Sequence, residues 1–199
     1  MFKREWFDIV ATAPKGAHFV RYWDKAGTKD AGAYTAGVLL AAHKGTYYFC
    51  DMIMGQWEAA ERERVISQTL AADDAKYGRV YTYVEQEPGS GGKESAQATI
   101  IRNPGYVVQA DKPTGDKVLR AEPLAAQCEA RNVKMINASW NQRALDILTS
   151  FPNGIKDMVD AASGAFKYLP HVGAGTIQSD KDYASRWGIN NHNGGKWRL

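Results

Sequence analysis

The stretch YTAGVLLAAHKGTYYFCDMIMGQW, residues 34–57, decides the fold because it contains two long apolar strands joined by a short turn. Residues 34–43 and 46–57 carry the aliphatic and aromatic residues of buried strands, and the Lys-Gly pair between them indicates a tight hairpin. A third segment of this kind, AHFVRYWD at residues 17–24, comes before them. The sequence therefore predicts a meander of three antiparallel strands at the start of the domain.

Helices and strands alternate after this meander. In chain order, the predicted elements are a helix over 58–77, a strand over 79–87, a helix over 90–103, a strand over 105–113, a helix over 117–131, and helices over 141–151 and 156–169, with a short strand left open at 133–136. Strands that follow helices return to the sheet in parallel. We therefore expect an α/β protein with the RNase H-like arrangement, a five-stranded mixed sheet of three antiparallel strands and then parallel crossover strands, flanked by helices.

The composition is that of a globular protein. Of the 199 residues, 44% are hydrophobic and 24% are charged, which is enough apolar surface for one substantial core. We assign residues 1–169 to that domain and residues 170–199, rich in Gly and Asn, to a partly disordered tail. The net charge of +3 suits a polyanionic partner without requiring one. No apolar run reaches the roughly 20 residues of a membrane span, so we expect a soluble intracellular protein without a membrane partner.

The two cysteines argue against two kinds of site. Cys50 and Cys128 lie in apolar stretches and form no C-x-x-C pair. A zinc centre or a disulfide framework would need closer or more numerous cysteines. The sequence predicts two buried thiols instead.

Four acids occupy special positions in this layout. Asp24 ends the first predicted strand, Glu85 ends the fourth, and Asp157 and Asp160 lie one turn apart at the start of the last helix. In a mixed sheet the first and fourth strands can be neighbours, and the late helix can cross their ends. Carboxylates gathered in this way repel each other unless a cation neutralises them, and Mg²⁺ and Mn²⁺ prefer such oxygen ligands. Two such ions about 3.5–4 Å apart support phosphodiester cleavage.

Each acid also has a purely structural interpretation, which the residues alone leave open. Asp24 could end a strand and begin a turn, and Asp157 could interact with the helix dipole in the first turn. Asp160 could be a solvated helix residue. The joint placement of the acids at the ends of elements favours a site.

Long ordered strings then point to a family. The segments YVEQEPGSGGK (83–93), KPTGDKVLRAEPLAAQCEARNV (112–133) and FPNGIKDMVDAASGAF (151–166) resemble the C-terminal nuclease domain of phage terminase large subunits, as do FKREWF (2–7) and RYWDKAGTKDAGAYTAGVLL (21–40). The resemblance covers roughly residues 2–169. It implies an RNase H-like endonuclease that uses two Mg²⁺ or Mn²⁺ ions to cut concatemeric viral double-stranded DNA during genome packaging, with little sequence specificity.

The resemblance also assigns roles by position. Asp24 matches the family's first-strand acid and Glu85 its fourth-strand acid. Asp157 matches the second Asp of a segment usually written H-D-D-x-V-D-A, which makes it the expected third catalytic ligand. Asp160 matches the last Asp and is expected to be a supporting or alternative metal ligand.

The sequence departs from the family pattern at three positions. Ile155 and Lys156 stand where His and the first Asp are expected, so a lysine enters the acidic cluster, where it would bind phosphate or weaken metal affinity. Ala33 stands where relatives often carry an acid, so its loop should contribute no ligand.

Basic residues near the acids are the expected DNA contacts: Lys25, Lys93, Lys117 and Arg120. Contacts to phosphate would make binding sensitive to salt and largely independent of sequence. The alternative for each is an ordinary solvated cation.

The resemblance further implies partners. Complete terminases carry an N-terminal ATPase domain and work with a small subunit and a portal in the host cell cytoplasm. The present sequence has no G-x-x-x-x-G-K-[ST] motif, since GSGGKES at residues 89–95 has the wrong spacing. It is therefore expected to be an isolated nuclease domain that begins at an introduced Met1.

Two other functions remain open at this point. A Holliday-junction resolvase or transposase-like nuclease would share the fold and the acids. A docking module of the packaging motor, inactive as a nuclease in isolation, would account for Lys156 and for the missing ATPase half.

Overall fold

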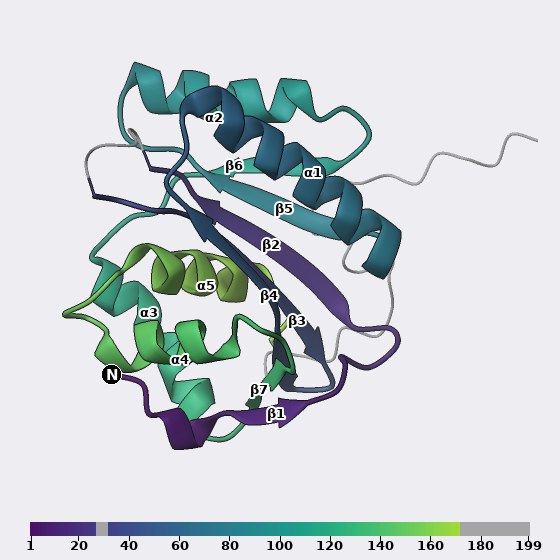
Figure 1. Ribbon diagram of the computed structural model, residues 1–199, viewed down its shortest axis with the longest axis vertical. Coiled ribbons are helices and arrows are strands. Elements are labelled where there is room, and N and C mark those ends of the chain that lie inside the picture. The colour runs from purple at the N-terminus through teal and green to yellow at the C-terminus, as the bar shows by residue number, and fades with distance from the viewer. Residues whose placement is uncertain (27–31, 172–199) are drawn as a thin grey trace, which may run out of the picture.

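The computed structural model describes residues 1–26 and 32–171. The expected tail lies outside the described residues, apart from its first two positions. Within them, one mixed sheet runs through the molecule with helices on both faces (Figure 1). Among the helices of these two ranges, none combines the length and the apolar character that spanning a membrane requires.

The elements follow the predicted order closely. They are η1 (Arg4–Trp6), β1 (Asp8–Val10), β2 (His18–Asp24), β3 (Thr35–His43), β4 (Thr46–Gly55), α1 (Ala59–Tyr77), β5 (Val80–Glu85), α2 (Ser90–Arg102), β6 (Val107–Asp111), α3 (Lys117–Glu129), β7 (Val133–Ile136), α4 (Asn141–Ser150) and α5 (Asp157–Tyr168). The five predicted helices are all present, and their ends differ from the prediction by at most two residues.

The sheet has the strand order β1-β7-β4-β3-β2-β5-β6. Strands β2, β3 and β4 form the predicted antiparallel meander, and β5 pairs in parallel with β2 and with β6. The prediction of an α/β, RNase H-like sheet is confirmed, but the count of five strands is wrong because the described sheet has seven. Strand β7 is the segment left open at 133–136, and β1 is a three-residue strand that pairs only with β7. Three residues are too few to show a strand period in the sequence.

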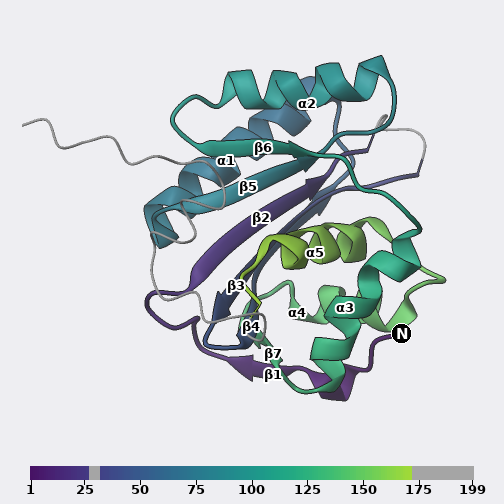
Figure 2. The ribbon, with the colours of Figure 1, turned by 180° about the vertical axis from the view of Figure 1, so that it is seen from behind.

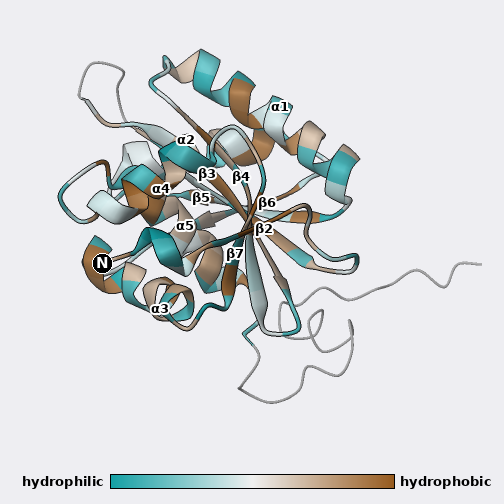
Figure 3. Cartoon of the chain, turned by 60° about the horizontal axis from the view of Figure 1, so that its bottom comes forward, coloured by the Kyte–Doolittle hydropathy of each residue, from teal (hydrophilic) through white to brown (hydrophobic). Residues whose placement is uncertain are grey.

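The two faces of the sheet bury different side chains. On one face α1 and α2 pack through Ile66, Leu70 and Ala96 against Trp23 and Val84. On the other, α3, α4 and α5 build the larger core over β2, β3 and β4 (Figures 1 and 2). Polar and apolar residues alternate around α1, as expected for a helix with one buried side (Figure 3). Strand β3 lies between the layers, which explains its nearly continuous apolar sequence. Cys50 and Cys128 are buried free thiols, as predicted.

A fully buried arginine anchors β2 on the α1 side. Arg21 donates to both carboxylate oxygens of Asp73 on α1, at 2.8 and 2.7 Å, and to Asp51 on β4 at 2.8 Å. Its charge is therefore paired and its donors are used, the condition under which a buried guanidinium is tolerated. This network ties α1 to the centre of the sheet.

On the opposite side, α5 lies unusually close to β2. A Cβ atom at Gly164 would lie 2.6 Å from the ring of Tyr22, which is 1% exposed. Glycine therefore permits the close approach. The same approach carries the first turn of α5 over the end of β2.

Replacing this glycine should loosen the contact between helix and sheet. We expect Gly164→Ala to lower the free energy of unfolding by about 1–2 kcal/mol, because overpacking outweighs the better helix propensity of alanine. Gly91→Ala is the matched control, since Gly91 is also helical but has nothing within 4 Å of the position that a Cβ atom would take. Urea denaturation followed by circular dichroism measures both. Equal stabilities for the two variants would contradict the packing argument.

Candidate metal centre

The parallel pairing of β2 and β5 brings two acids together. The register sets Trp23 beside Val84, so Asp24 and Glu85 follow at the ends of neighbouring strands. Asp160, in the first turn of α5, lies over these ends. One carboxylate oxygen from each of the three residues lies within 4.8 Å of the others. The acidic cluster, as we call Asp24, Glu85 and Asp160, thus joins three elements distant in sequence.

The acidic cluster is largely shielded from solvent. Asp24 is 8% exposed and Asp160 is 4% exposed, and Glu85 is half-buried with a buried Oε2 atom that has no hydrogen-bond partner among the residues that the structure describes. Burial raises the pKa of Asp24 to about 7, with Glu85 and Asp160 adding to the rise and Lys117 opposing it. Burial and the neighbouring Asp160 also raise the pKa of Glu85. The carboxylates therefore need cations nearby to remain ionised.

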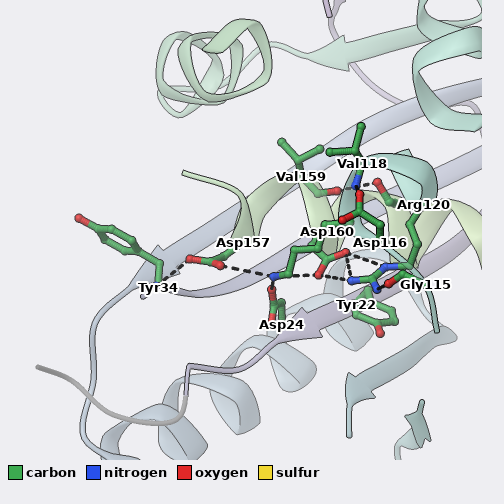
Figure 4. Close-up of polar contacts among 12 residues, drawn as sticks. Tyr22, Asp24, Tyr34, Gly115, Asp116, Val118, Arg120, Asp157, Val159 and Asp160 are labelled. Carbon is green, nitrogen blue, oxygen red and sulfur yellow. Dashed lines mark hydrogen bonds and ion pairs between the residues drawn. The ribbon is translucent and has the colours of Figure 1, made fainter. Parts of the chain in front are cut away.

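Helix α3 supplies two such cations. Lys117 places Nζ 3.1 Å from Asp24 Oδ2 and 2.9 Å from Asp160 Oδ2, and Arg120 Nη2 lies 2.6 Å from each oxygen of Asp160. The two basic residues are three positions apart and share a face of the helix. Asp116 caps the helix by accepting a hydrogen bond from Val118 N at 2.7 Å, which fixes where this face begins. Figure 4 shows Arg120 reaching Asp160 while Asp24 and Asp157 point toward the same centre.

Asp157 lies at the rim of the cluster rather than within it. Its Oδ2 accepts a hydrogen bond from Tyr34 N at 2.9 Å (Figure 4). Its Oδ1 is 3.7 Å from Lys117 Nζ. The sequence ranked Asp157 ahead of Asp160 as the third ligand, whereas the geometry puts Asp160 beside Asp24 and Glu85. Both positions share a helix face, so only the way α5 rests on the sheet distinguishes them.

The four predicted DNA contacts differ in their burial and in their partners. Lys25 is buried and donates to Ser95 and to Thr99, at 2.8 to 3.0 Å, so its predicted phosphate contact has no support in this arrangement. Lys93 is exposed on α2. Lys117 and Arg120 contact the acids instead of facing away from them. Contacts of all four with DNA remain predictions.

The three residues that depart from the family pattern lie in different surroundings. Ile155 packs against the main core, and Ala33 uses its carbonyl to accept a hydrogen bond from Gln56 at 3.5 Å. Lys156 is exposed at the N-cap of α5. The sequence predicted that Lys156 enters the acidic cluster. The lysine that contacts Asp24 and Asp160 is instead Lys117.

Sequence reasoning missed one further acid. Asp111 ends β6 directly beside Glu85 and accepts hydrogen bonds from Tyr22, Lys167 and Tyr168 at 2.9, 2.8 and 2.6 Å. Burial alone would raise the pKa of Asp111, but these bonds hold it below its usual value. Its place at a strand end, like that of Glu85, was the available signal. Asp111 thus borders the acidic cluster at Glu85, but its own oxygens are taken by these three partners.

The residues present fit a divalent metal ion. Three carboxylates with no cysteine or histidine among them are the donor set of Mg²⁺ or Mn²⁺. The Oε2 atom of Glu85 accepts no hydrogen bond from residues 1–26 or 32–171, so this oxygen is available to a metal ion. The Lys117 ammonium, held by two of the same carboxylates, marks where a cation is attracted.

Comparison with solved structures identifies the fold. The large terminase nuclease from thermophilic phage G20c with bound magnesium superposes with a TM-score of 0.60 at 14% identity, over 83% of this chain and 95% of that one. The manganese-soaked human cytomegalovirus terminase nuclease domain gives 0.64 at 12% identity, over 84% and 94%. This chain has the fold of a terminase nuclease domain. The resemblance inferred from the sequence is thus confirmed at the level of the fold.

A longer terminase also matches the nuclease fold. The large terminase from another thermophilic bacteriophage gives a TM-score of 0.58 at 13% identity, and the match covers 81% of this chain but 42% of that one. The present chain therefore spans less than half of that terminase. No protein-family model and no curated protein matches the sequence.

The ion pair between Arg120 and buried Asp160 should carry measurable stability. We expect Arg120→Met to lower the free energy of unfolding by about 2–4 kcal/mol without divalent metal, because it leaves a buried carboxylate with Lys117 alone. Arg64→Met is the control, since Arg64 makes an exposed pair with Glu61 on α1 and should change stability by about 0.5 kcal/mol or less. Chemical denaturation in EDTA checks both values. A loss below about 1 kcal/mol for Arg120→Met would refute the electrostatic role assigned to it.

Proposed function

We propose that the protein is a divalent-metal-dependent endonuclease that hydrolyses phosphodiester bonds of double-stranded DNA with two metal ions and little sequence specificity. The observation that carries the proposal is the convergence of Asp24, Glu85 and Asp160 from two strand ends and a helix, where a buried oxygen of Glu85 has no partner within the described part of the chain. The fold shared with terminase nuclease domains that were solved with magnesium or manganese supports it.

Each residue has a distinct part in this proposal. Asp24, Glu85 and Asp160 would hold the ions, and Asp157 at the rim would contribute to a second one. Bound there, the ions would supply an activated water and stabilisation of the leaving oxygen. Arg120 keeps both oxygens of Asp160 in a fixed orientation through its two short contacts. Burial on the strand ends limits the water that would otherwise weaken these interactions.

DNA binding would depend on contacts to the sugar-phosphate backbone of the DNA. Cations near the cluster can contact phosphate, which carries no base sequence, so cutting should be nearly indifferent to sequence and sensitive to salt. Lys93, which follows Glu85 in the sequence, is exposed on α2. It is therefore the predicted DNA contact whose side chain is most open to solvent.

The wider biological role is part of the same proposal. We place the domain in viral genome packaging, cutting concatemeric DNA in the host cell cytoplasm, together with an ATPase domain, a terminase small subunit and a portal. The match to the longer bacteriophage terminase, which was also solved with ADP, supports the link to an ATPase.

Cleavage of a plasmid tests the enzyme directly. With Mg²⁺ or Mn²⁺, supercoiled plasmid should be nicked and then linearised, and EDTA should stop this. Asp24→Asn, Glu85→Gln and Asp160→Asn should each slow cleavage by about a hundredfold or more, since each removes a charged ligand. Asp74→Asn, an exposed acid on α1, should cut at the wild-type rate. Wild-type cleavage by any one of the three cluster variants would show that the ligand set is wrong.

The choice of DNA substrate separates this function from the closest alternative. We expect linear duplex and four-way junctions of equal length to be cut at similar rates, because the proposed chemistry acts on the phosphodiester bond that both substrates share. Gel assays with both substrates measure the ratio. A clear preference for the junction would favour a resolvase, and no cleavage of either would favour a docking module.

A further inference from the structure

We propose that Lys117 is a resident counter-ion of the acidic cluster, occupying the position in which a divalent ion would bridge Asp24 and Asp160, so that metal loading must displace its ammonium group. This inference rests on the metal site of the proposed function. It assigns to Lys117 control over when, and how tightly, that site accepts metal.

The contacts of Lys117 define the position. Its Nζ lies 3.1 Å from Asp24 Oδ2, 2.9 Å from Asp160 Oδ2 and 3.7 Å from Asp157 Oδ1, so three carboxylates surround it. A lysine in contact with carboxylates is a cation at neutral pH.

A metal ion and this ammonium group cannot share the same oxygens. A divalent ion lies about 2.0–2.1 Å from each ligand oxygen in a magnesium site. An ion bound to Asp24 Oδ2 and Asp160 Oδ2 would have the Lys117 nitrogen as a cationic neighbour at very short range. Repulsion between like charges is strong where water is scarce, so one of the two cations must leave.

The charge balance favours displacement of Lys117 when two ions bind. Asp24, Glu85, Asp157 and Asp160 are four carboxylates, and the two cations Lys117 and Arg120 offset two of them. The remaining charge suits one divalent ion, whereas two ions bring twice that amount. Moving Lys117 out restores one more negative charge to the cluster, which favours the second ion.

Lys117 is also the cation that can move. Its side chain is 37% exposed at the first position of α3, whereas Arg120 is 21% exposed and makes two contacts of 2.6 Å to one carboxylate. A lysine stem can swing toward solvent without disturbing the core. A phosphate group arriving with DNA would attract the released ammonium, so that DNA and metal would each strengthen binding of the other.

Metal binding without DNA tests the inference apart from cleavage. We expect Lys117→Met to bind Mn²⁺ about tenfold more tightly than wild type by isothermal titration calorimetry, because it removes the competing cation. Lys134→Met is the matched control: Lys134 makes an ion pair of 2.9 Å with Asp8 and is 30% exposed, but lies on β7 away from the cluster. It should bind Mn²⁺ as wild type does.

A second measurement uses the wild-type chain, in case Lys117→Met does not fold without metal. Reductive methylation followed by mass spectrometry reports how accessible each lysine amine is. Adding Mn²⁺ should increase methylation of Lys117 at least severalfold and leave Lys134 unchanged. Unchanged labelling of Lys117 while Mn²⁺ binds would overturn the inference.

The outcomes separate this inference from the proposed function. If wild type and Lys117→Met bind Mn²⁺ with equal affinity and the wild type cuts DNA, the proposed nuclease function is supported and the proposed displacement of Lys117 is wrong. If neither protein binds Mn²⁺, the metal site itself is wrong and both proposals fail. Tighter binding by Lys117→Met together with increased methylation of wild-type Lys117 would establish the displacement.

Discussion

Repulsion among three carboxylates is the constraint around which the molecule is organised. Asp24, Glu85 and Asp160 bring oxygens within 4.8 Å of each other at a place where burial raises the pKa of Asp24 to about 7. Such a cluster of carboxylates does not stabilise the fold, because each carboxylate loses hydration and is repelled by its charged neighbours. The cations of α3, Lys117 and Arg120, offset part of this cost. The position of α3 against α5 is thus an electrostatic requirement as well as a packing contact.

The rest of the fold holds the cluster in place. Strand β2 carries Asp24 from the middle of the sheet, with antiparallel β3 on one side and parallel β5 on the other. Buried Arg21 fastens β2 to α1 and β4 on one face, and Gly164 lets α5 approach Tyr22 on the other. Carboxylates on such rigid elements keep their geometry when no cation is bound. For the proposed function these rigid elements would give a preformed site, in which Lys117 takes the place of a metal ion.

The sequence could predict the elements and the strand-end acids, because apolar runs, turns and helix starts are local features. Asp24 and Glu85 were found in this way, since a meander followed by crossover strands makes their strands neighbours. Local features could not decide between Asp157 and Asp160, which share a helix face and differ only in how α5 is seated on the sheet. They could not show that Lys117 turns inward, because that depends on the path of α3 across the cluster. Strand β1 was missed because it is three residues long and exists only through its pairing with β7.

The most direct test of the account is a crystal structure of the protein soaked in Mn²⁺, with anomalous scattering to locate the ions. The account predicts an anomalous peak about 2 Å from carboxylate oxygens of Asp24, Glu85 and Asp160, with the ammonium of Lys117 moved away from Asp24 and Asp160. Anomalous density elsewhere, or none at millimolar Mn²⁺ with Lys117 still bound to both aspartates, would contradict it.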